Sequence, residues 1–150
     1  MEDIVIRRAE HGDIPAIVRL LADDILGASR ESPDDLAPYY TAFEAIERDL
    51  HQILAVLERE QSVIGTLQLS FIPGIAHRGA WRCEIESVRI ASSERGRGLG
   101  AGLIHWTIKE AQSRGCAVVQ LTSNNTRTDA HRFYERLGFV PSHRGFKLAL

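Results

Sequence analysis

The sequence predicts an α/β (α+β) fold in which one sheet carries helices on both of its faces. Two observations lead to this prediction. Strand-like and helix-like segments follow one another along the 150 residues in the order β-α-α-β-β-β-α-β-α-β-β, and no repeat, low-complexity tract or linker interrupts them. A chain of this length suits one core, and such mixing of elements is typical of a sheet covered by helices. We therefore expect a single domain over residues 1–150.

The first half of the chain predicts a strand, two helices and a hairpin. Residues 3–8 alternate apolar and polar side chains, as a half-buried strand does. Asp13 can cap a helix whose apolar stripe has spacings of three and four. The expected elements are a strand over Asp3–Arg8, a helix after Asp13 with Ile14, Ile17, Val18 and Leu21 in its stripe, a loop over Gly27–Pro38, a helix over about Asp35–Leu50, and an antiparallel hairpin of Ile53–Leu57 and Val63–Phe71 joined by Glu58–Gln61.

The second half predicts three further strand regions and two helices. The segment Cys116–Thr122 is nearly all apolar, which is typical of a strand covered on both faces. Gly115 and Gly138 each follow a helical pattern and stop it. The expected elements are a flexible connection over Ile72–Ala80, a strand over Trp81–Ile90, a helix over Leu103–Gln112, a strand over Cys116–Thr122, a turn over Asn124–Asp129, a short helix over Ala130–Leu137, and a final hairpin of Phe139–Val140 and Phe146–Leu150.

Composition excludes several classes of protein. The net charge of −2 lacks the basic excess of a nucleic-acid binder, and no apolar run approaches the ~20 residues of a membrane span. The opening Met-Glu-Asp-Ile is acidic, unlike a secretory signal. Cys83 and Cys116 are the two cysteines, which favours buried thiols in a reducing compartment over a disulfide framework. We expect a cytoplasmic protein without nucleic-acid or membrane partners.

A glycine-rich turn over Glu94–Gly102 joins the strand-like Ile85–Ile90 to the helix-like Leu103–Gln112. Glycines let the backbone approach a ligand closely. The first N–H groups of a helix lack intrahelical partners, and the helix dipole adds partial positive charge. Arg95 and Arg97 add cations. The turn is therefore predicted to hold a phosphate group.

Two well-known phosphate-binding patterns fit this turn poorly. Gly96–Ala101 satisfies the dinucleotide pattern G-x-G-x-x-G/A, but the acid expected about 20 residues later is missing from Cys116–Thr122. A Walker A loop needs a Gly-Lys pair, and the chain has none.

A third pattern fits better. Arg95-Gly96-Arg97-Gly98-Leu99-Gly100 matches R/Q-x-x-G-x-G/A, and the chain resembles the GNAT superfamily of N-acetyltransferases in this acyl-CoA signature. The segments Glu86–Ile90 and Ala130–Phe139 are similar to the family's fourth strand and last helix, and Ile6–Ala9 with Asp13 resembles its opening. The resemblance implies one mixed, mostly antiparallel sheet of about seven strands with about four helices on both faces. It also implies that the fourth and fifth strands splay apart.

The resemblance implies that acetyl-CoA, as co-substrate, lies in this gap. Its pantetheine arm would bond to the backbone of Val88 and Ile90, and its pyrophosphate would sit on the N–H groups of Arg95–Gly100. Many members carry an asparagine where this chain has Arg127, so either Asn125 or Arg127 takes over that contact, although Asn124-Asn125 is equally explained as a turn. The implied cofactor-binding residues are Val88, Arg89, Ile90, Arg95, Gly96, Arg97, Gly98, Leu99, Gly100, Asn125, Arg127 and Tyr134.

Catalysis of amine attack on a thioester needs a base and benefits from an acid, because an alkyl amine with a pKa near 10.4 is mostly protonated at neutral pH. The resemblance assigns the base to Glu86 and the acid to Tyr134. Glu84 lies on the same strand face as Glu86 and is an alternative base. Both glutamates could instead be solvated or paired with Arg82, and Tyr134 could be a core aromatic.

The acceptor is open at this stage: a small-molecule or peptide amine suits the chemistry. A covalent route through Cys83 or Cys116 is a rival mechanism, and the histidines show no metal-ligand spacing, so no metal is expected. A catalytically weak CoA or acetyl-CoA sensor and a dinucleotide-binding oxidoreductase are alternative functions. Homodimers are common in the family, although no feature of this sequence specifies one.

Overall fold

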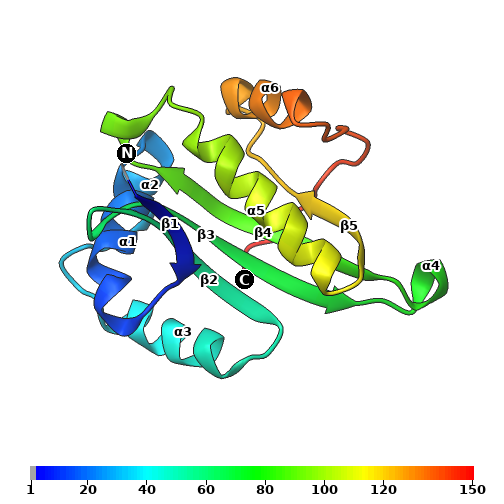
Figure 1. The fold of residues 1–150 in the computed structure, drawn as a ribbon, viewed down its shortest axis with the longest axis horizontal. Helices are drawn as coiled ribbons and strands as arrows, with labels where there is room; N and C mark the ends of the chain where they lie inside the picture. The colour runs from blue at the N-terminus through cyan, green and yellow to red at the C-terminus, as the bar shows by residue number, and fades with distance from the viewer. Residues whose placement is uncertain (1–2) are drawn as a thin grey trace.

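A computed structural model of the protein describes residues 3–150; Met1 and Glu2, part of the acidic opening, lie outside the described residues. Five strands form one sheet in the order β1-β2-β3-β4-β5, antiparallel except for the parallel pair β4 and β5 (Figure 1). The strands are β1 (Ile4–Arg8), β2 (Gln52–Arg59), β3 (Ser62–Pro73), β4 (Trp81–Ile90) and β5 (Cys116–Leu121). The expected mixed sheet is confirmed, but the described residues hold five strands rather than about seven.

Six α-helices and two 3₁₀ segments complete the described part of the chain, where about four helices were expected. Two of the α-helices are short, and α4 is a turn in which His77 and Arg78 have positive φ. The helical elements are η1 (His11–Asp13), α1 (Ile14–Ala22), α2 (Ile25–Arg30), α3 (Ala37–Arg48), α4 (Ala76–Gly79), η2 (Ser92–Glu94), α5 (Leu99–Ser113) and α6 (Thr128–Arg136).

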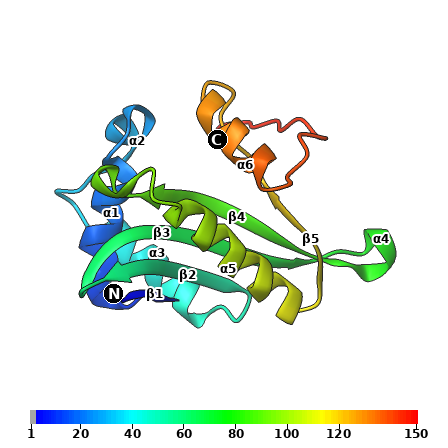
Figure 2. The ribbon, with the colours of Figure 1, turned by 45° about the horizontal axis from the view of Figure 1, so that its top comes forward.

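Strand alternation divides the core between the two faces of the sheet. Ile53 and Ala55 of β2 point into the cluster that contains Leu103 and Ile104 of α5. Val56, one residue further on, points the other way and packs with residues of α1 and α3. Helix α5 therefore covers one face, and α1 and α3 cover the other (Figures 1 and 2).

The segment Gly27–Pro38 is not all loop, because helix α2 spans Ile25–Arg30. The Asp24 side chain accepts a hydrogen bond from the N–H of Gly27 and so caps this helix. A Cβ on Gly27 would lie 1.9 Å from the carbonyl oxygen of Leu21, so only glycine allows α2 to pack this closely on the end of α1. Helix α3 is two residues shorter at each end than the expected Asp35–Leu50.

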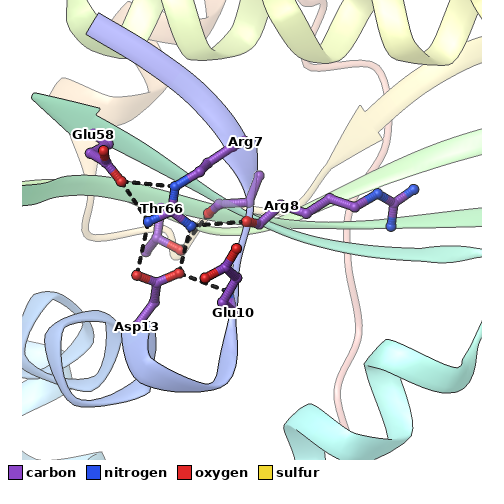
Figure 3. Close-up of polar contacts among 7 residues, drawn as sticks. Arg7, Arg8, Glu10, Asp13, Glu58 and Thr66 are labelled. Carbon is purple, nitrogen blue, oxygen red and sulfur yellow. Dashed lines mark hydrogen bonds and ion pairs between the residues drawn. The ribbon is translucent and has the colours of Figure 1, made fainter. Parts of the chain in front are cut away.

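Arg7 ties β1 to β2 and to the start of α1 (Figure 3). Its guanidinium donates two hydrogen bonds to Asp13, at 2.7 and 3.0 Å, and its Nε donates to Glu58 at 2.8 Å. Asp13 also accepts from the N–H of Glu10 at 2.7 Å. The hydrogen bonds from Arg7 hold the pKa of Asp13 below its ordinary value. Asp13 does occupy the N-cap position of α1, as predicted, but its side chain makes no capping hydrogen bond to that helix. It is instead the ion-pair partner of Arg7 in the sheet.

The C-terminal part of the chain corrects two expectations. No hairpin forms from Phe139–Val140 and Phe146–Leu150, since residues 137–150 carry no helix or strand. The segment Cys116–Thr122 is also not covered on both faces: β5 is the edge of the sheet, and its Ala117, Val118 and Gln120 are exposed (Figure 1). The apolar pattern correctly predicted a strand, but it wrongly predicted that both faces of this strand are buried.

None of the helices among residues 3–150 is both long enough and apolar enough to pass through a membrane.

The Arg7 network predicts a pH-dependent stability. The Asp13 carboxylate, with its lowered pKa, stabilises the fold fully above its ordinary pKa of 3.8, and this contribution is lost as the pH falls through the lower folded value. We expect Asp13→Asn, which keeps an acceptor for Glu10, to lower the free energy of unfolding at pH 7 by about 1–3 kcal/mol. Urea unfolding at several pH values should show the difference shrinking below pH 3.8.

The exposed Asp34→Asn serves as the control and should change stability far less. A destabilisation by Asp13→Asn that stays constant down to pH 2 would contradict this account.

Candidate active site

Strands β4 and β5 separate halfway along β4. They pair only from Trp81 to Ile85 of β4, although β4 continues to Ile90 against β3. At the separation the β3–β4 register shifts, so that Ser87 and Val88 together oppose Leu67. Ser87 has a φ of 56°, as a bulged strand residue can have. The bulge bends β4 away from β5, and the expected splay is thereby present.

The glycine turn lies at the end of β4 and leads directly into α5. Gly98 is the N-cap residue of α5, with a φ of 77°, and Gly96 has a φ of 79°. These left-handed conformations favour glycine. A Cβ at either position would meet no atom within 4 Å, so the space in front of the helix start is open. The turn therefore presents the first N–H groups of α5 to that space.

The helix begins earlier than the expected Leu103. Leu99, Gly100 and Gly102 already belong to the first turn of α5. A Cβ on Gly100 would lie 3.3 Å from Cζ of Phe133, so this glycine gives room to α6 rather than to a turn. The glycine turn and α6 are consequently in direct contact.

The two arginines of the turn are held by the protein. The Nε of Arg95 donates to the carbonyl oxygen of Ile90 at 3.3 Å. Arg97 is more exposed and lies 3.4 Å from Glu94, which also accepts a hydrogen bond from Arg59. Glu94 is thus shared between two cations, and the turn keeps an excess of positive charge.

Tyr134 reaches the site from α6, and its ring is part of the core as well. The ring packs edge-on against Phe133 and Phe139, with centroids 5.0 and 5.7 Å away. Burial raises the pKa of Tyr134, an effect partly offset by the charges of Arg89 and Arg127. The phenol is therefore protonated at neutral pH and able to donate a proton or a hydrogen bond.

Glu84 and Glu86 lie on the sheet face opposite α5, as their alternation with the buried Cys83 and Ile85 requires. Gln120 of β5 donates to Glu84 at 2.6 Å, whereas Glu86 is exposed. The cross-strand partner of Glu86 is Gln68. On this face a shallow cavity of about 250 Å³ is lined by Ala45, Ile46, Asp49, Gln52, Gln68 and Ser70. Gln68, the cross-strand partner of Glu86, lines this hollow, whereas Glu86 itself does not.

A part-buried charge cluster lies between β4, α2 and the start of α6. Arg127 donates to Oδ2 of Asp24 at 2.6 Å, and the Nε of Arg89 lies 3.4 Å from the same oxygen. The side chains are only 14–29% exposed. Burial acts to raise the pKa of Asp24, but its hydrogen bonds with Gly27 and Arg127 and the charge of Arg89 outweigh burial and lower it. Two guanidinium groups therefore share one carboxylate, and the buried Nε of Arg89 makes no hydrogen bond to any described residue.

Asp24 is the residue of this site that sequence reasoning missed. The only signal was local: an aspartate three residues before Gly27 is a helix-capping pattern. That pattern predicts α2 but not the contact with Arg127, which lies 103 positions along the chain.

The two asparagines before α6 have different surroundings. Oδ1 of Asn124 accepts hydrogen bonds from the N–H and the hydroxyl of Thr126, at 2.9 and 2.7 Å. Asn124 therefore makes a turn, as one of the two interpretations predicted. Asn125 is exposed beside it.

The two cysteines are poorly suited to nucleophilic attack. Cys83 is fully buried, and burial, together with the neighbouring Cys116, raises the pKa of its thiol to about 12. Burial also raises the pKa of Cys116. A thiol that stays protonated is a weak nucleophile. Among residues 3–150, His, Cys, Asp and Glu side chains form no group of three or more that could hold a metal ion.

Comparison with known proteins identifies this arrangement. The sequence model of the "Acetyltransferase (GNAT) family" matches residues 15–139, which include the glycine turn, both separated strands and α6. The chain belongs to this family. It is 33% identical over 109 residues to an aminoalkylphosphonate N-acetyltransferase of Salmonella typhimurium, covering 73% of this chain and 69% of the relative.

Solved structures agree with the fold. A crystal structure of a transcriptional regulator from Bacillus halodurans C-125 is 42% identical and has a TM-score of 0.95, with 99% of this chain and all of that chain covered. An aminoglycoside N-acetyltransferase in complex with CoA shares the fold at 16% identity, with a TM-score of 0.82 over 100% of this chain and 96% of the other. The GNAT protein described here is accordingly an acyltransferase.

Proposed function

We propose that this protein transfers the acetyl group of acetyl-CoA directly to the primary amine of a small molecule that also carries an anionic group. The observation that carries the donor half is the separation of β4 from β5, with the open start of α5 at one end and Tyr134 beside it. An extended thioester fits between the strands, and its pyrophosphate fits the N–H groups of Arg95–Gly100.

The donor contacts follow from the bulge. The bulge takes Val88 out of the regular ladder, so its N–H is available to the acetyl carbonyl. The same N–H would stabilise the oxyanion that forms when the amine attacks. The backbone of Ile90 and the side chain of Asn125 are proposed to hold the pantetheine arm.

In the proposed reaction Glu86 acts as the base. An alkyl ammonium with a pKa near 10.4 is neutral in only about one molecule per thousand or fewer at pH 7, so a proton must be removed. Glu86 takes that proton, directly or through water, and the amine nitrogen attacks the thioester carbon. Glu86 suits this role better than Glu84, because Gln120 already holds the carboxylate of Glu84.

Tyr134 then assists the leaving group. As the C–S bond breaks, the phenol gives its proton to the CoA thiolate. Because a phenol is about 1.5 pKa units less acidic than a thiol, this transfer costs roughly 2 kcal/mol if completed alone. The tyrosine is therefore most useful as a hydrogen-bond donor while charge develops on sulfur, and its raised pKa keeps it protonated for that purpose.

The acceptor class is argued from the charge cluster. Arg89 and Arg127 share one carboxylate in a part-buried setting, so an anionic ligand would complete their charge balance. The Salmonella relative is named for an acceptor that combines an amine with a phosphonate. We infer that the anionic group of the acceptor binds these arginines while its amine faces Glu86.

The overall proposal is tested by thiol release from acetyl-CoA over a panel of amines. We expect turnover with small amines that bear a phosphonate or phosphate, and weaker turnover with matched amines that lack the anion. Tight acetyl-CoA binding without turnover on any amine would overturn the proposal in favour of a CoA-responsive binding protein. The similar protein from Bacillus halodurans is described as a transcriptional regulator, which is the reason to test this alternative. Binding of NAD but not of CoA would overturn the donor assignment itself.

Glu86→Gln is expected to lower kcat at pH 7 by about 10²-fold or more, since the variant cannot take a proton. The affinity for acetyl-CoA, measured by calorimetry, should not change. The defect should narrow as the pH rises toward the pKa of the amine, because more acceptor is then already neutral.

Glu84→Gln is the matched control, on the same strand face, and should keep most of the activity. If Glu84→Gln abolishes turnover and Glu86→Gln does not, the base is Glu84 and not Glu86.

Arg127→Gln is expected to raise KM for an anionic amine by about 10- to 100-fold, the worth of a hydrogen bond to a charged group. KM for an amine whose tail is uncharged and KM for acetyl-CoA should stay within about twofold, because the anionic group is the only part of either substrate that is proposed to contact this arginine. Steady-state kinetics with both substrates varied provides the measurement.

Arg132→Gln, within the helix that Arg127 precedes, is the control, because Arg132 pairs with the exposed Asp129. A rise in KM for acetyl-CoA instead would place Arg127 in the donor site.

A further inference from the structure

The segment η2, which leads from β4 into the glycine turn, is held to the sheet at two points. The N–H of Ala91, its N-cap residue, donates to the carbonyl oxygen of Ile64 in β3 at 2.8 Å. Glu94, its last residue, accepts a hydrogen bond from the guanidinium of Arg59, the last residue of β2. Arg59 lies 35 positions before Glu94, so this contact is made by the fold and not by local sequence. Two strands of the sheet therefore fix the start of the glycine turn.

The hairpin between β2 and β3 holds Arg59 in place. Arg59 pairs with Ser62, and the two residues between them, Glu60 and Gln61, have φ values of 48° and 66°. Two positive φ values are typical of the tight hairpin turn that asparagine and glycine favour, and other side chains adopt them at a cost. The side chains of Arg59 and Glu94 are only 12% and 15% exposed. A costly turn thus orients an arginine toward a part-buried carboxylate.

This carboxylate is an unfavourable neighbour for a phosphate site. Glu94 lies two positions before Gly96 of the turn, and its negative charge would repel a bound phosphate if it stood alone. The oxygen that accepts from Arg59 also lies 3.4 Å from Nη1 of Arg97, whose side chain is 56% exposed. One oxygen therefore has a part-buried guanidinium at hydrogen-bond distance and an exposed guanidinium further away. The exposed one, Arg97, is the one that is able to turn to a ligand.

We propose that Arg59 is a positioning residue for the acetyl donor: by neutralising Glu94, it frees Arg97 to bind a phosphate group of acetyl-CoA. This inference rests on the proposed function, since it takes the glycine turn as the donor site. When the donor binds, Arg97 exchanges its longer contact with Glu94 for a phosphate oxygen. The carboxylate keeps Arg59 as its charge partner throughout.

Neutralisation and simple anchoring have different consequences. If the pair only holds η2 to the sheet, removal of either partner does similar harm to donor binding. If Arg59 neutralises Glu94, its removal leaves a carboxylate that repels the phosphates and retains Arg97. Removal of the charge of Glu94 then does little harm, because nothing competes for Arg97.

Isothermal titration calorimetry of the full chain with acetyl-CoA tests this proposal. Arg59→Gln is expected to raise the dissociation constant by about 5- to 30-fold, because the charge of Glu94 is left beside the phosphates. Glu94→Gln keeps an oxygen that can accept from Arg59 and should raise the constant by no more than about twofold. When Arg59→Gln is added to Glu94→Gln, no further loss of affinity is expected.

Two further measurements separate charge from packing. Arg59→Lys keeps the cation and should bind acetyl-CoA within about threefold of the unaltered protein. At about 1 M sodium chloride, where charges are screened beyond about 3 Å, the defect of Arg59→Gln should shrink to about twofold. Arg48→Gln is the matched control, because it removes an equal charge from an exposed pair at the end of α3 and should leave the affinity unchanged.

Unchanged affinity in Arg59→Gln would overturn this inference and leave the proposed function intact. The same holds if Glu94→Gln weakens binding as much as Arg59→Gln does, because the pair then only anchors the turn. Should Arg59→Gln fail to unfold cooperatively, Glu94→Gln decides alone: retained affinity supports the inference, and a loss of about fivefold or more overturns it. Failure of the unaltered protein to bind acetyl-CoA would overturn the donor assignment of the proposed function, and this inference with it.

Discussion

The separation of β4 from β5 is the constraint on which the rest of the site depends. Two parallel strands that pair through Ile85 must part if a ligand is to lie between them, and the bulge at Ser87 and Val88 provides the bend. Parting costs the hydrogen bonds that the two strands would otherwise share, and buried backbone groups need partners. A ligand with its own amides and carbonyls can supply them. The gap that costs these hydrogen bonds is therefore the same gap that is proposed to bind the extended thioester.

The parts of the fold that follow from local chemistry could be predicted from the sequence. The glycine turn, the helix after it and the apolar pattern of α6 depend on neighbours a few positions away, and the family resemblance rests on the same segments. What could not be predicted depends on distant contacts. The pairing of Asp24 with Arg127 spans 103 positions. The segment Phe146–Leu150 alternates as a strand should, yet no strand among residues 3–150 pairs with it.

Two arginine–carboxylate clusters in this protein resemble each other in composition and differ in balance. Around Arg7 one guanidinium meets two carboxylates and the excess charge is negative, whereas around Asp24 one carboxylate meets two guanidinium groups. The first cluster joins β1, β2 and the start of α1, and its one guanidinium is fully paired with carboxylates. The second lies beside Tyr134 and retains an unsatisfied positive charge, which is the physical difference between a structural ion pair and a candidate recognition site.

The two oxygens of the Asp24 carboxylate have different partners. Oδ1 accepts from the N–H of Gly27 and holds α2, while Oδ2 faces Arg89 and Arg127. An asparagine at this position would retain the first contact and lose the charge of the second. The cap on α2 and the charge beside Arg89 and Arg127 depend on different atoms of this one side chain. The charge beside the two arginines can therefore change at this one position while the cap on α2 is kept.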